Sequence, residues 1–358
     1  MELESLLNEA YKHKGYIERS MRLSTHTPHN ITRMCFNENF FGMSPKAKEV
    51  YLKMVDNTYI YPDFRTVNLK QALADYYDFS IDNVIAVAGS SVLIDMIGAV
   101  FLNPGDEVLY CAPTFGAYYD MAIEHGGVPV EVPLDNQMRF DLSGLKDKIS
   151  EKTKIIVICN PNNPTGTYLN DQAMAKFIKE LPKDIIVMVD EAYLEFSEAS
   201  DCQTMLPLIK ECPDQPIIVL KTFSKVFGMA GLRVGYGLAN EDVIDQLMRS
   251  VHSWNVSLIG EAVAIEALKD TEHLNYVIAE TIKGRHYLEE QLEKLGCIVY
   301  PSQTSFIYFD THRDPQWVME ELLQEGVMIG AFAINRVSIA NQENNERFIE
   351  KLKVCLAK

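Results

Sequence analysis

The sequence between Lys154 and Gly166 decides the fold, and it reads KIIVICNPNNPTG. The run KIIVIC is almost continuously apolar and β-branched, which predicts a strand that is buried on both faces. The loop NPNNPTG combines three asparagines with two prolines and a glycine, so it holds amide side chains in fixed positions. An ordinary turn needs fewer such residues. We therefore expect a buried parallel strand that ends in a functional loop.

Other apolar runs have the same character, and helical patterns separate them. The runs are Asn83–Ala88, Glu107–Cys111, Asp184–Val189 and Pro216–Leu220, and the helical patterns include Val92–Phe101, Phe115–His125 and Asp171–Glu180. This alternation predicts an α/β fold with a mostly parallel central sheet and helices on both of its faces.

The C-terminal part of the chain has a different pattern. Long helices are expected over Glu261–Leu295, a strand over Gln303–Phe309, and further helices over Trp317–Gln324 and Asn345–Leu356. Such a pattern predicts a smaller α+β domain. We expect a large domain over 46–250, a small C-terminal domain over 251–358, and an N-terminal arm over 1–45 that forms part of the small domain.

Composition excludes several classes of protein. The chain has 358 residues and a formal net charge of −17, from 33 Lys and Arg against 50 Asp and Glu, so it should not bind nucleic acid. No apolar run approaches the ~18 residues of a membrane helix, and the N-terminus lacks the features of a signal peptide. The seven cysteines form no Cys-x-x-Cys pair, which predicts reduced thiols in the cytoplasm and no metal site.

Polar residues follow the apolar runs, at the edge of the sheet where ligands bind in open α/β folds. Ser90 and Ser91 open a helix and suit a phosphate, although an ordinary helix cap is the favoured explanation when this feature is taken alone. Asp190 follows another strand and either faces a pocket or caps the next helix. Lys225 and Arg233 occur in glycine-rich, low-charge sequence, which favours a desolvated amine over a surface lysine.

Together these residues supply an amine, a carboxylate, an amide, an aromatic ring and a phosphate cradle. Pyridoxal phosphate requires this set, because a lysine must form its Schiff base and a carboxylate must keep its pyridine nitrogen protonated. No P-loop or Gly-x-Gly-x-x-Gly follows a strand, so a plain nucleotide-binding protein is a weaker alternative.

The motifs resemble those of fold-type I pyridoxal-phosphate enzymes, in the class I and II aminotransferase group, and most of all the histidinol-phosphate aminotransferase family. The resemblance covers nearly the whole chain. Its most specific motifs are NNPTG at Asn162–Gly166, DEAY at Asp190–Tyr193, and SKVFG at Ser224–Gly228 with Arg233. Further matching segments are Asn37–Pro45, Tyr61–Asp63, Asn103–Asp106 and Pro113–Phe115.

The resemblance implies pyridoxal 5′-phosphate as the cofactor and a role for each matching residue. Lys225 would form the Schiff base and move the proton at the substrate α-carbon, and Asp190 would pair with the pyridine nitrogen. Tyr193 and Asn163 would hydrogen-bond the phenolic oxygen of the cofactor, and the bond from Asn163 to Pro164 would be cis. The remaining implied contacts are Phe115 on the cofactor ring and Ser90, Ser91, Thr222, Ser224 and Arg233 on the phosphate.

The resemblance also implies a homodimer with a shared active site, in which Tyr61 reaches the phosphate held by the neighbouring subunit. Arg336 matches the arginine that grips the acidic group of the substrate, and Asn39 is expected at the substrate as well. For Tyr61 and Phe115 core packing is a rival explanation, and for Arg336 a surface ion pair is. The implied activity is amino transfer between an α-amino acid, or a related amine, and a 2-oxo acid in amino-acid metabolism.

Some positions depart from the family pattern. Gly330 stands where a second substrate-binding arginine is expected, and one arginine neutralises a buried phosphate poorly. Histidinol phosphate is therefore doubtful as a substrate, and an α-carboxylate suits Arg336 better. Lys221 replaces an arginine that is common in the family, with no consequence that the sequence reveals.

Two other functions are alternatives to amino transfer, and the first of them shares these motifs. Relatives of the same shape decarboxylate, eliminate, cyclise or oxidise amino acids, and only pocket geometry decides which bond breaks. A non-catalytic regulator with an aminotransferase-like domain would be expected to carry a DNA-binding extension and a damaged lysine motif, and the sequence shows neither.

Overall fold

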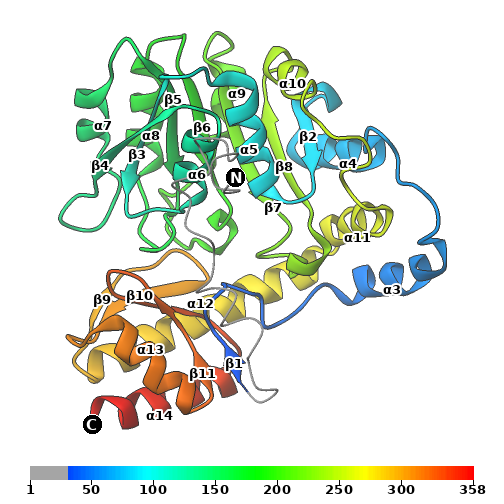
Figure 1. The fold of residues 1–358 in the computed structure, drawn as a ribbon. Coiled ribbons are helices and arrows are strands. Elements are labelled where there is room, and N and C mark those ends of the chain that lie inside the picture. Colours follow the sequence, from blue (N-terminus) through cyan, green and yellow to red (C-terminus); the bar gives the residue numbers. More distant parts are fainter. Residues whose placement is uncertain (1–30) are drawn as a thin grey trace, which may run out of the picture.

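A seven-stranded sheet forms the centre of the larger part of the protein (Figure 1). This computed structural model describes residues 31–358. The strand order is β2-β8-β7-β6-β5-β3-β4, and β8 is the strand that runs antiparallel to its neighbours. The strands are β2 Val84–Val87, β3 Glu107–Ala112, β4 Val128–Pro133, β5 Thr153–Cys159, β6 Ile186–Asp190, β7 Ile217–Thr222 and β8 Gly235–Ala239.

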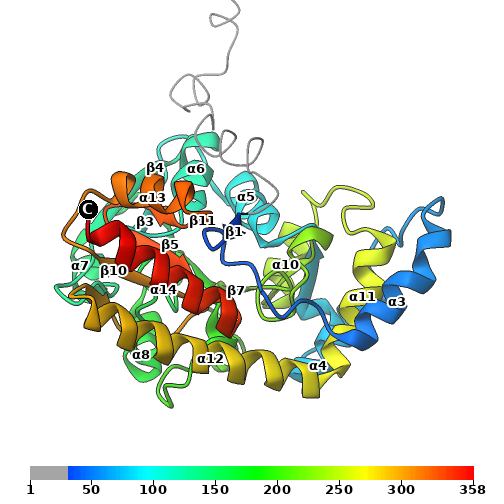
Figure 2. The same ribbon diagram turned by 90° about the horizontal axis from the view of Figure 1, so that it is seen from below.

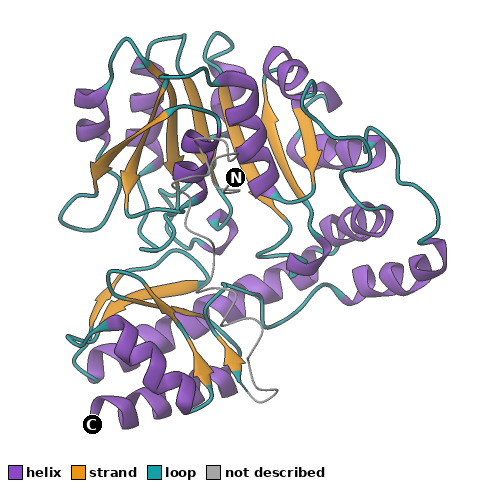
Figure 3. Ribbon diagram, viewed as in Figure 1, coloured by secondary structure: helices purple, strands orange, loops and turns teal. Residues whose placement is uncertain are grey.

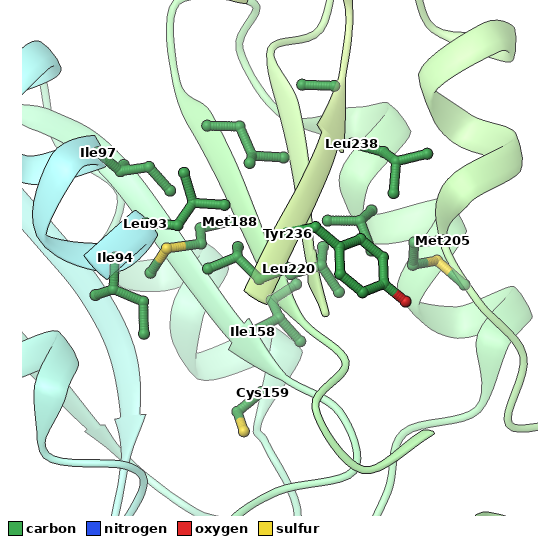
Figure 4. Close-up of a cluster of buried hydrophobic side chains, with 14 of the residues drawn as sticks. Leu93, Ile94, Ile97, Ile158, Cys159, Met188, Met205, Leu220, Tyr236 and Leu238 are labelled. Carbon is green, nitrogen blue, oxygen red and sulfur yellow. The ribbon is translucent and has the colours of Figure 1, made fainter. Parts of the chain in front are cut away.

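The buried core explains why these runs form strands. Every residue of β6, β7 and β8 is buried, which requires cover on both faces of the sheet. Figure 4 shows Leu93, Ile94 and Ile97 of helix α5 beside Met188 of the sheet, with Met205 on the other side of the strands. The helices of this part are α3 Pro45–Met54, α4 Val67–Tyr77, α5 Ser90–Phe101, α6 Ala117–Glu124, α7 Leu142–Lys148, α8 Asp171–Glu180, α9 Leu206–Glu211, α10 Glu241–Leu247 and α11 Leu258–Lys269.

The smaller part has its own antiparallel sheet, separate from the central one (Figure 3). Its order is β12-β13-β10-β9, and the N-terminal strand β1 pairs in parallel with β11 beside it. Its elements are β1 Thr32–Arg33, α12 Thr271–Lys294, β9 Ile298–Tyr300, β10 Phe306–Asp310, α13 Pro315–Gln324, β11 Val327–Met328, β12 Gly330–Ala331, β13 Asn335–Ser338 and α14 Gln342–Leu356. The first thirty residues of the expected N-terminal arm lie outside the described residues.

Two hydrophobic cores divide the chain, and the division differs from the boundary expected at residue 250. Helix α11 and Val277 of α12 belong to the core of the large sheet, whereas Leu288 of the same helix belongs to the small core. The division therefore falls inside α12, which runs along both parts (Figure 2). On the N-terminal side, Met34 packs in the small core and Ala47 in the large one.

None of the helices among residues 31–358 combines the length and the apolar character that a membrane crossing requires.

Candidate active site

A cavity of about 970 Å³ opens at the carboxyl edge of the large sheet and reaches the small domain. It brings together most of the residues that the sequence singles out. These are Ser90, Ser91, Phe115, Asn163, Asp190, Tyr193, Thr222, Ser224, Lys225, Arg233 and Arg336. Tyr61 and Asn39 are the two expected site residues that do not line it.

One end of the cavity is built to hold an anion. Helix α5 begins at Ser90, and its preceding residue Gly89 has φ +102° and no side chain to cap the helix, so the first N–H groups stay available. A Cβ at Gly89 would overlap the guanidinium of Arg233, so glycine is required for the cation to approach the helix. Arg233 itself has φ +54° and donates to the Ala230 carbonyl over 3.0 Å. A helix N-terminus beside an arginine fits a phosphate group.

Asp190 lies at the end of β6, buried in the floor of the cavity. Its carboxylate accepts hydrogen bonds from the Tyr118 hydroxyl over 2.8 Å and from the Ala192 N–H over 3.0 Å. Burial nevertheless raises the pKa of the Asp190 carboxyl above its usual value. A buried carboxylate of this kind is stabilised by a cation in the cavity, and a protonated pyridine nitrogen provides one.

Lys225 follows β7 and directs its amine into the same space. The Nζ atom donates to the carbonyls of Phe36 over 3.1 Å and Asn37 over 3.3 Å, and lies 5.4 Å from the centre of the Tyr193 ring. The Tyr193 hydroxyl accepts from the Asn37 side-chain amide over 3.0 Å. The amine is thus held by neutral carbonyls, beside a phenol and near a carboxylate.

Asn39 has a different position from the one expected. Its side-chain amide donates to the backbone carbonyls of Lys225 over 3.2 Å and Val226 over 2.9 Å, so it holds the lysine loop and does not face the cavity. Asn37, two residues earlier, lines the cavity instead. The sequence segment that begins at Asn37 matches the family and contains both asparagines, but their spacing does not show which of the two side chains points into the cavity.

Arg336 forms the substrate side of the cavity from strand β13. Its guanidinium donates to the Asn163 side-chain carbonyl and, over 2.7 Å, to the Cys35 carbonyl, while its Nε has no partner. The rings of Phe306 and Phe332 have centroids 5.2 and 4.7 Å from its Cζ. Burial lowers the pKa of Arg336, so an incoming anion would find a poorly hydrated cation.

Gly330 is the direct cross-strand partner of Arg336. A Cβ at this glycine would lie 2.7 Å from the Phe332 ring, so the ring fills the space next to the missing side chain. The position where the family pattern places a second arginine therefore lies beside Arg336, and an aromatic ring covers it.

The bond between Asn163 and Pro164 is cis, as the resemblance implied. Tyr61 is 76% exposed and packs on Trp254, with ring centroids 4.9 Å apart, away from the cavity of its own chain.

Several lining residues carried no signal in the sequence. Cys35 and Phe36 reach the cavity through the N-terminal segment. Tyr118 of α6 does not line the cavity, but its hydroxyl donates to Asp190, although in the sequence it reads as an ordinary core residue. Helix α13 adds a further wall, composed of Gln316, Met319, Glu320 and Leu323. These contacts depend on how the small domain packs on the large one, which local sequence does not encode.

The chain resembles known aminotransferases over nearly its whole length. Residues 29–352 match the family described as aminotransferase class I and II. A histidinol-phosphate aminotransferase of Moorella thermoacetica is 35% identical, with 92% of this chain and 86% of that protein covered, and one of Staphylococcus carnosus is 36% identical, with 90% of each covered.

A solved structure has the same arrangement. The histidinol-phosphate aminotransferase of Sinorhizobium meliloti, in complex with pyridoxal-5′-phosphate, superposes with a TM-score of 0.91 at 25% identity, covering 99% of this chain and 98% of that one. A Thermus thermophilus aspartate aminotransferase variant shares the fold, with a TM-score of 0.82 at 23% identity over 98% of this chain and 99% of that one. This chain belongs to the class I and II aminotransferases, and within them to the histidinol-phosphate aminotransferase type.

Proposed function

We propose that this aminotransferase uses pyridoxal phosphate to move the amino group of an α-amino acid to a 2-oxo acid. The observation that carries the substrate class is Arg336. It lies opposite Gly330, and it remains available for a substrate carboxylate after Lys225 and Arg233 are assigned to the cofactor.

The residues of the cavity fit the cofactor group by group. Arg233, the N-terminus of α5 and the hydroxyls near it suit the phosphate, and Asp190 suits a protonated ring nitrogen. Tyr193 and Asn163 hold donors for the phenolic oxygen, and Phe115 provides a flat surface for the ring. When bound, pyridoxal phosphate supplies an aldehyde that condenses with amines and a ring that withdraws electrons from the substrate α-carbon.

The chain's own residues then direct the reaction. Arg336 binds the substrate carboxylate with two parallel N–H donors and so fixes the orientation of the α-carbon. The Lys225 amine removes the proton from that carbon, and the Phe36 and Asn37 carbonyls orient it. The low polarity of the Phe306 and Phe332 rings around Arg336 strengthens its attraction for the carboxylate.

We also propose a homodimer in the cytoplasm. Exposed apolar side chains gather on α3, on the segment between α3 and α4 and on the loop before α11, and a monomer would leave them in water. They are Leu52, Tyr59, Ile60, Tyr61, Phe64 and Trp254. A twofold axis at this surface would bring Tyr61 to the cofactor phosphate of the partner. All seven cysteines are free thiols, which supports a reducing compartment.

A donor panel tests the proposed reaction. The holoenzyme is incubated with single amino acids or histidinol phosphate and a mixture of 2-oxo acids, and new amino acids and carbon dioxide are measured by mass spectrometry. We expect amino transfer from at least one α-amino acid, at a higher kcat/KM than from histidinol phosphate. If histidinol phosphate is the best donor, the assignment of Arg336 to an α-carboxylate is wrong. Release of carbon dioxide without amino transfer would favour the decarboxylase alternative.

A further inference from the structure

Two carboxylates flank Tyr193 in the sequence, and one buried amine binds both of them. Lys221 forms ion pairs with Glu191 over 3.0 Å and with Glu195 over 2.9 Å. The side chains of Lys221 and Glu191 are 4% and 1% exposed, and that of Glu195 is 22% exposed. Burial lowers the pKa of the Lys221 amine, but Glu195 and Glu191 outweigh this effect and raise the pKa well above its ordinary value, so the amine stays charged.

The ion cluster of Lys221 lies behind the wall of the cavity. Successive residues of a strand point to opposite faces of the sheet, and Thr222, the next residue of β7, lines the cavity. The Lys221 side chain therefore points away from the cavity. The same strand continues into the loop that carries Lys225, and the two carboxylate partners belong to the segment that carries Tyr193. The cluster thus joins the two segments that present these side chains to the cofactor.

The segment that carries Tyr193 has little regular structure of its own. It forms one turn of 3₁₀ helix, over Leu194–Phe196. The Leu194 N–H donates to the Glu191 carbonyl over 3.2 Å. The Phe196 N–H donates to the Tyr193 carbonyl over 3.1 Å. A single 3₁₀ turn stabilises a chain only weakly, so the two ion pairs, one before and one after Tyr193, fix the place of the phenol.

Loss of the Lys221 amine would affect its two partners differently. Both carboxylates lie within reach of one atom, so they would repel each other and lose their counter-charge. Glu191 would keep hydrogen bonds from the Thr204 hydroxyl and the Met205 N–H, each over 2.7 Å. Glu195 is closer to water, so it would move outward and displace the 3₁₀ turn next to Tyr193.

We propose that Lys221 is a positioning residue, which holds the segment Glu191–Glu195 so that the Tyr193 hydroxyl meets the phenolic oxygen of the cofactor. Lys221 acts through Tyr193 and not by its own contact with the cofactor. The inference rests on the proposed function, from which it takes the contact between Tyr193 and the cofactor. An arginine at position 221 would preserve the effect, because its guanidinium keeps a cation between the two carboxylates.

The first test is the pH titration of the visible absorption of the holoenzyme. A hydrogen bond to the phenolic oxygen makes the proton that this oxygen shares with the Lys225 nitrogen easier to lose, so a weaker contact from Tyr193 raises the midpoint. We expect a rise of about 1 pH unit in Tyr193→Phe and of ~0.5 unit or more in Lys221→Met. Lys221→Arg should differ from the wild type by less than ~0.2 unit, because it keeps the charge.

Lys179→Met is the matched control, since it removes the same charge from an exposed ion pair with Glu211. Its midpoint should equal that of the wild type. The proposal is wrong if Lys221→Met leaves the midpoint unchanged, or if Lys221→Arg shifts it as much as Lys221→Met does.

A double variant shows whether Lys221 acts through Tyr193. In the Tyr193→Phe background, Lys221→Met should add less than ~0.2 unit, because both substitutions then break the same contact. An equal shift in both backgrounds contradicts the role of Lys221 and leaves that of Tyr193 intact. If Tyr193→Phe itself leaves the midpoint unchanged, the contact assumed in the proposed function is wrong, and the role of Lys221 falls with it.

Hydrogen–deuterium exchange tests the positioning without the cofactor. In the full-length cofactor-free protein, the amides of residues 191–196 should exchange at least about threefold faster in Lys221→Met than in Lys179→Met, with no difference in β5. Glu195→Gln serves the same purpose if Lys221→Met does not fold, because it removes one partner at a partly exposed site. Equal exchange of residues 191–196 in the variant and the control would show that the ion pairs do not hold the segment.

Discussion

The two walls of the cavity differ in how they are built. The large-domain wall consists of residues at or shortly after the ends of buried strands, as Asp190 is the last residue of β6 and Lys225 lies in the loop after β7. The small-domain wall combines β12, β13, α13 and the segment near Cys35, which are distant in sequence. The first wall is fixed by one sheet, whereas the second depends on the packing of several short elements. Chemistry common to the family therefore lies on the first wall, and substrate choice lies on the second.

Lys225→Ala tests the large-domain wall and should have the largest effect. We expect kcat to fall by about 10⁴-fold with every donor, because the residue that moves the α-proton is lost. The wild-type holoenzyme should be yellow and should be labelled at residue 225 after borohydride treatment, whereas the variant should not. Equal loss across donors supports the division between the walls, and a loss confined to some donors contradicts it.

Asp190→Asn should reduce kcat by ~10²- to 10³-fold, because the charge facing the ring nitrogen disappears. In the cofactor-free protein, by contrast, the same substitution should increase the stability of the folded state. The folded-state pKa of Asp190 is raised, so its favourable contribution is present below the unfolded value of 3.8 and is lost as pH rises through the folded value.

The amide side chain in Asp190→Asn does not ionise, so the variant does not lose stability as the pH rises. Cofactor-free Asp190→Asn should therefore unfold at a higher temperature than the wild type near pH 7, with the difference shrinking as the pH falls toward ~4. Calorimetry at several pH values measures this difference. A variant that is less stable at every pH would show that the Tyr118 hydrogen bond outweighs the burial of the charge.

Arg336→Gln tests the small-domain wall. It should lower kcat/KM for carboxylate substrates by about tenfold to a hundredfold, because a charged hydrogen bond of ~1.5–3 kcal/mol is lost. Borohydride labelling of Lys225 should be unchanged, since the large-domain wall is intact. Loss of labelling would show that the two walls do not act separately.

Phe332→Leu should have the smallest effect, a twofold to fivefold rise in KM, because one cation–π contact of ~0.5–1 kcal/mol at Arg336 is removed. Steady-state kinetics with the best donor and the best acceptor measure the rise, which should be similar for both. A change in kcat with constant KM would instead indicate that Phe332 acts on the reaction step.

The sequence predicted the strands of the large sheet wherever an apolar run was continuous, as in KIIVIC of β5. It missed β4, whose segment contains two prolines, and β8, whose segment contains Gly235 and Gly237, because proline and glycine are poor strand formers by local preference. Tertiary packing, and not local preference, makes these two segments form strands. The buried Lys221 is a similar case, since its ion pairs with Glu191 at 3.0 Å and Glu195 at 2.9 Å come from a neighbouring strand end.

The site residues show the same division between positions that local sequence predicts and positions that tertiary packing decides. Apart from Tyr61, the expected cofactor residues on the large domain line the cavity, because strand ends lie at one edge of a parallel sheet. Asn39, expected at the substrate, lies outside the cavity lining, and Glu320 lines it without having been singled out, because their positions depend on the N-terminal segment and on α13. Whether the cofactor-site residues play the roles that the resemblance implies stays a prediction for the variants above.

Helix α12 has a practical consequence for work with fragments. Its 24 residues carry Val277 in one core and Leu288 in the other. A fragment that starts at residue 251 would expose the large-core face of α11 and α12 to water, and its complement would lack α11. Expression of either half alone should therefore yield insoluble material, and limited proteolysis between the halves should release no stable piece. A split reporter built on this protein would need its break in a surface loop elsewhere.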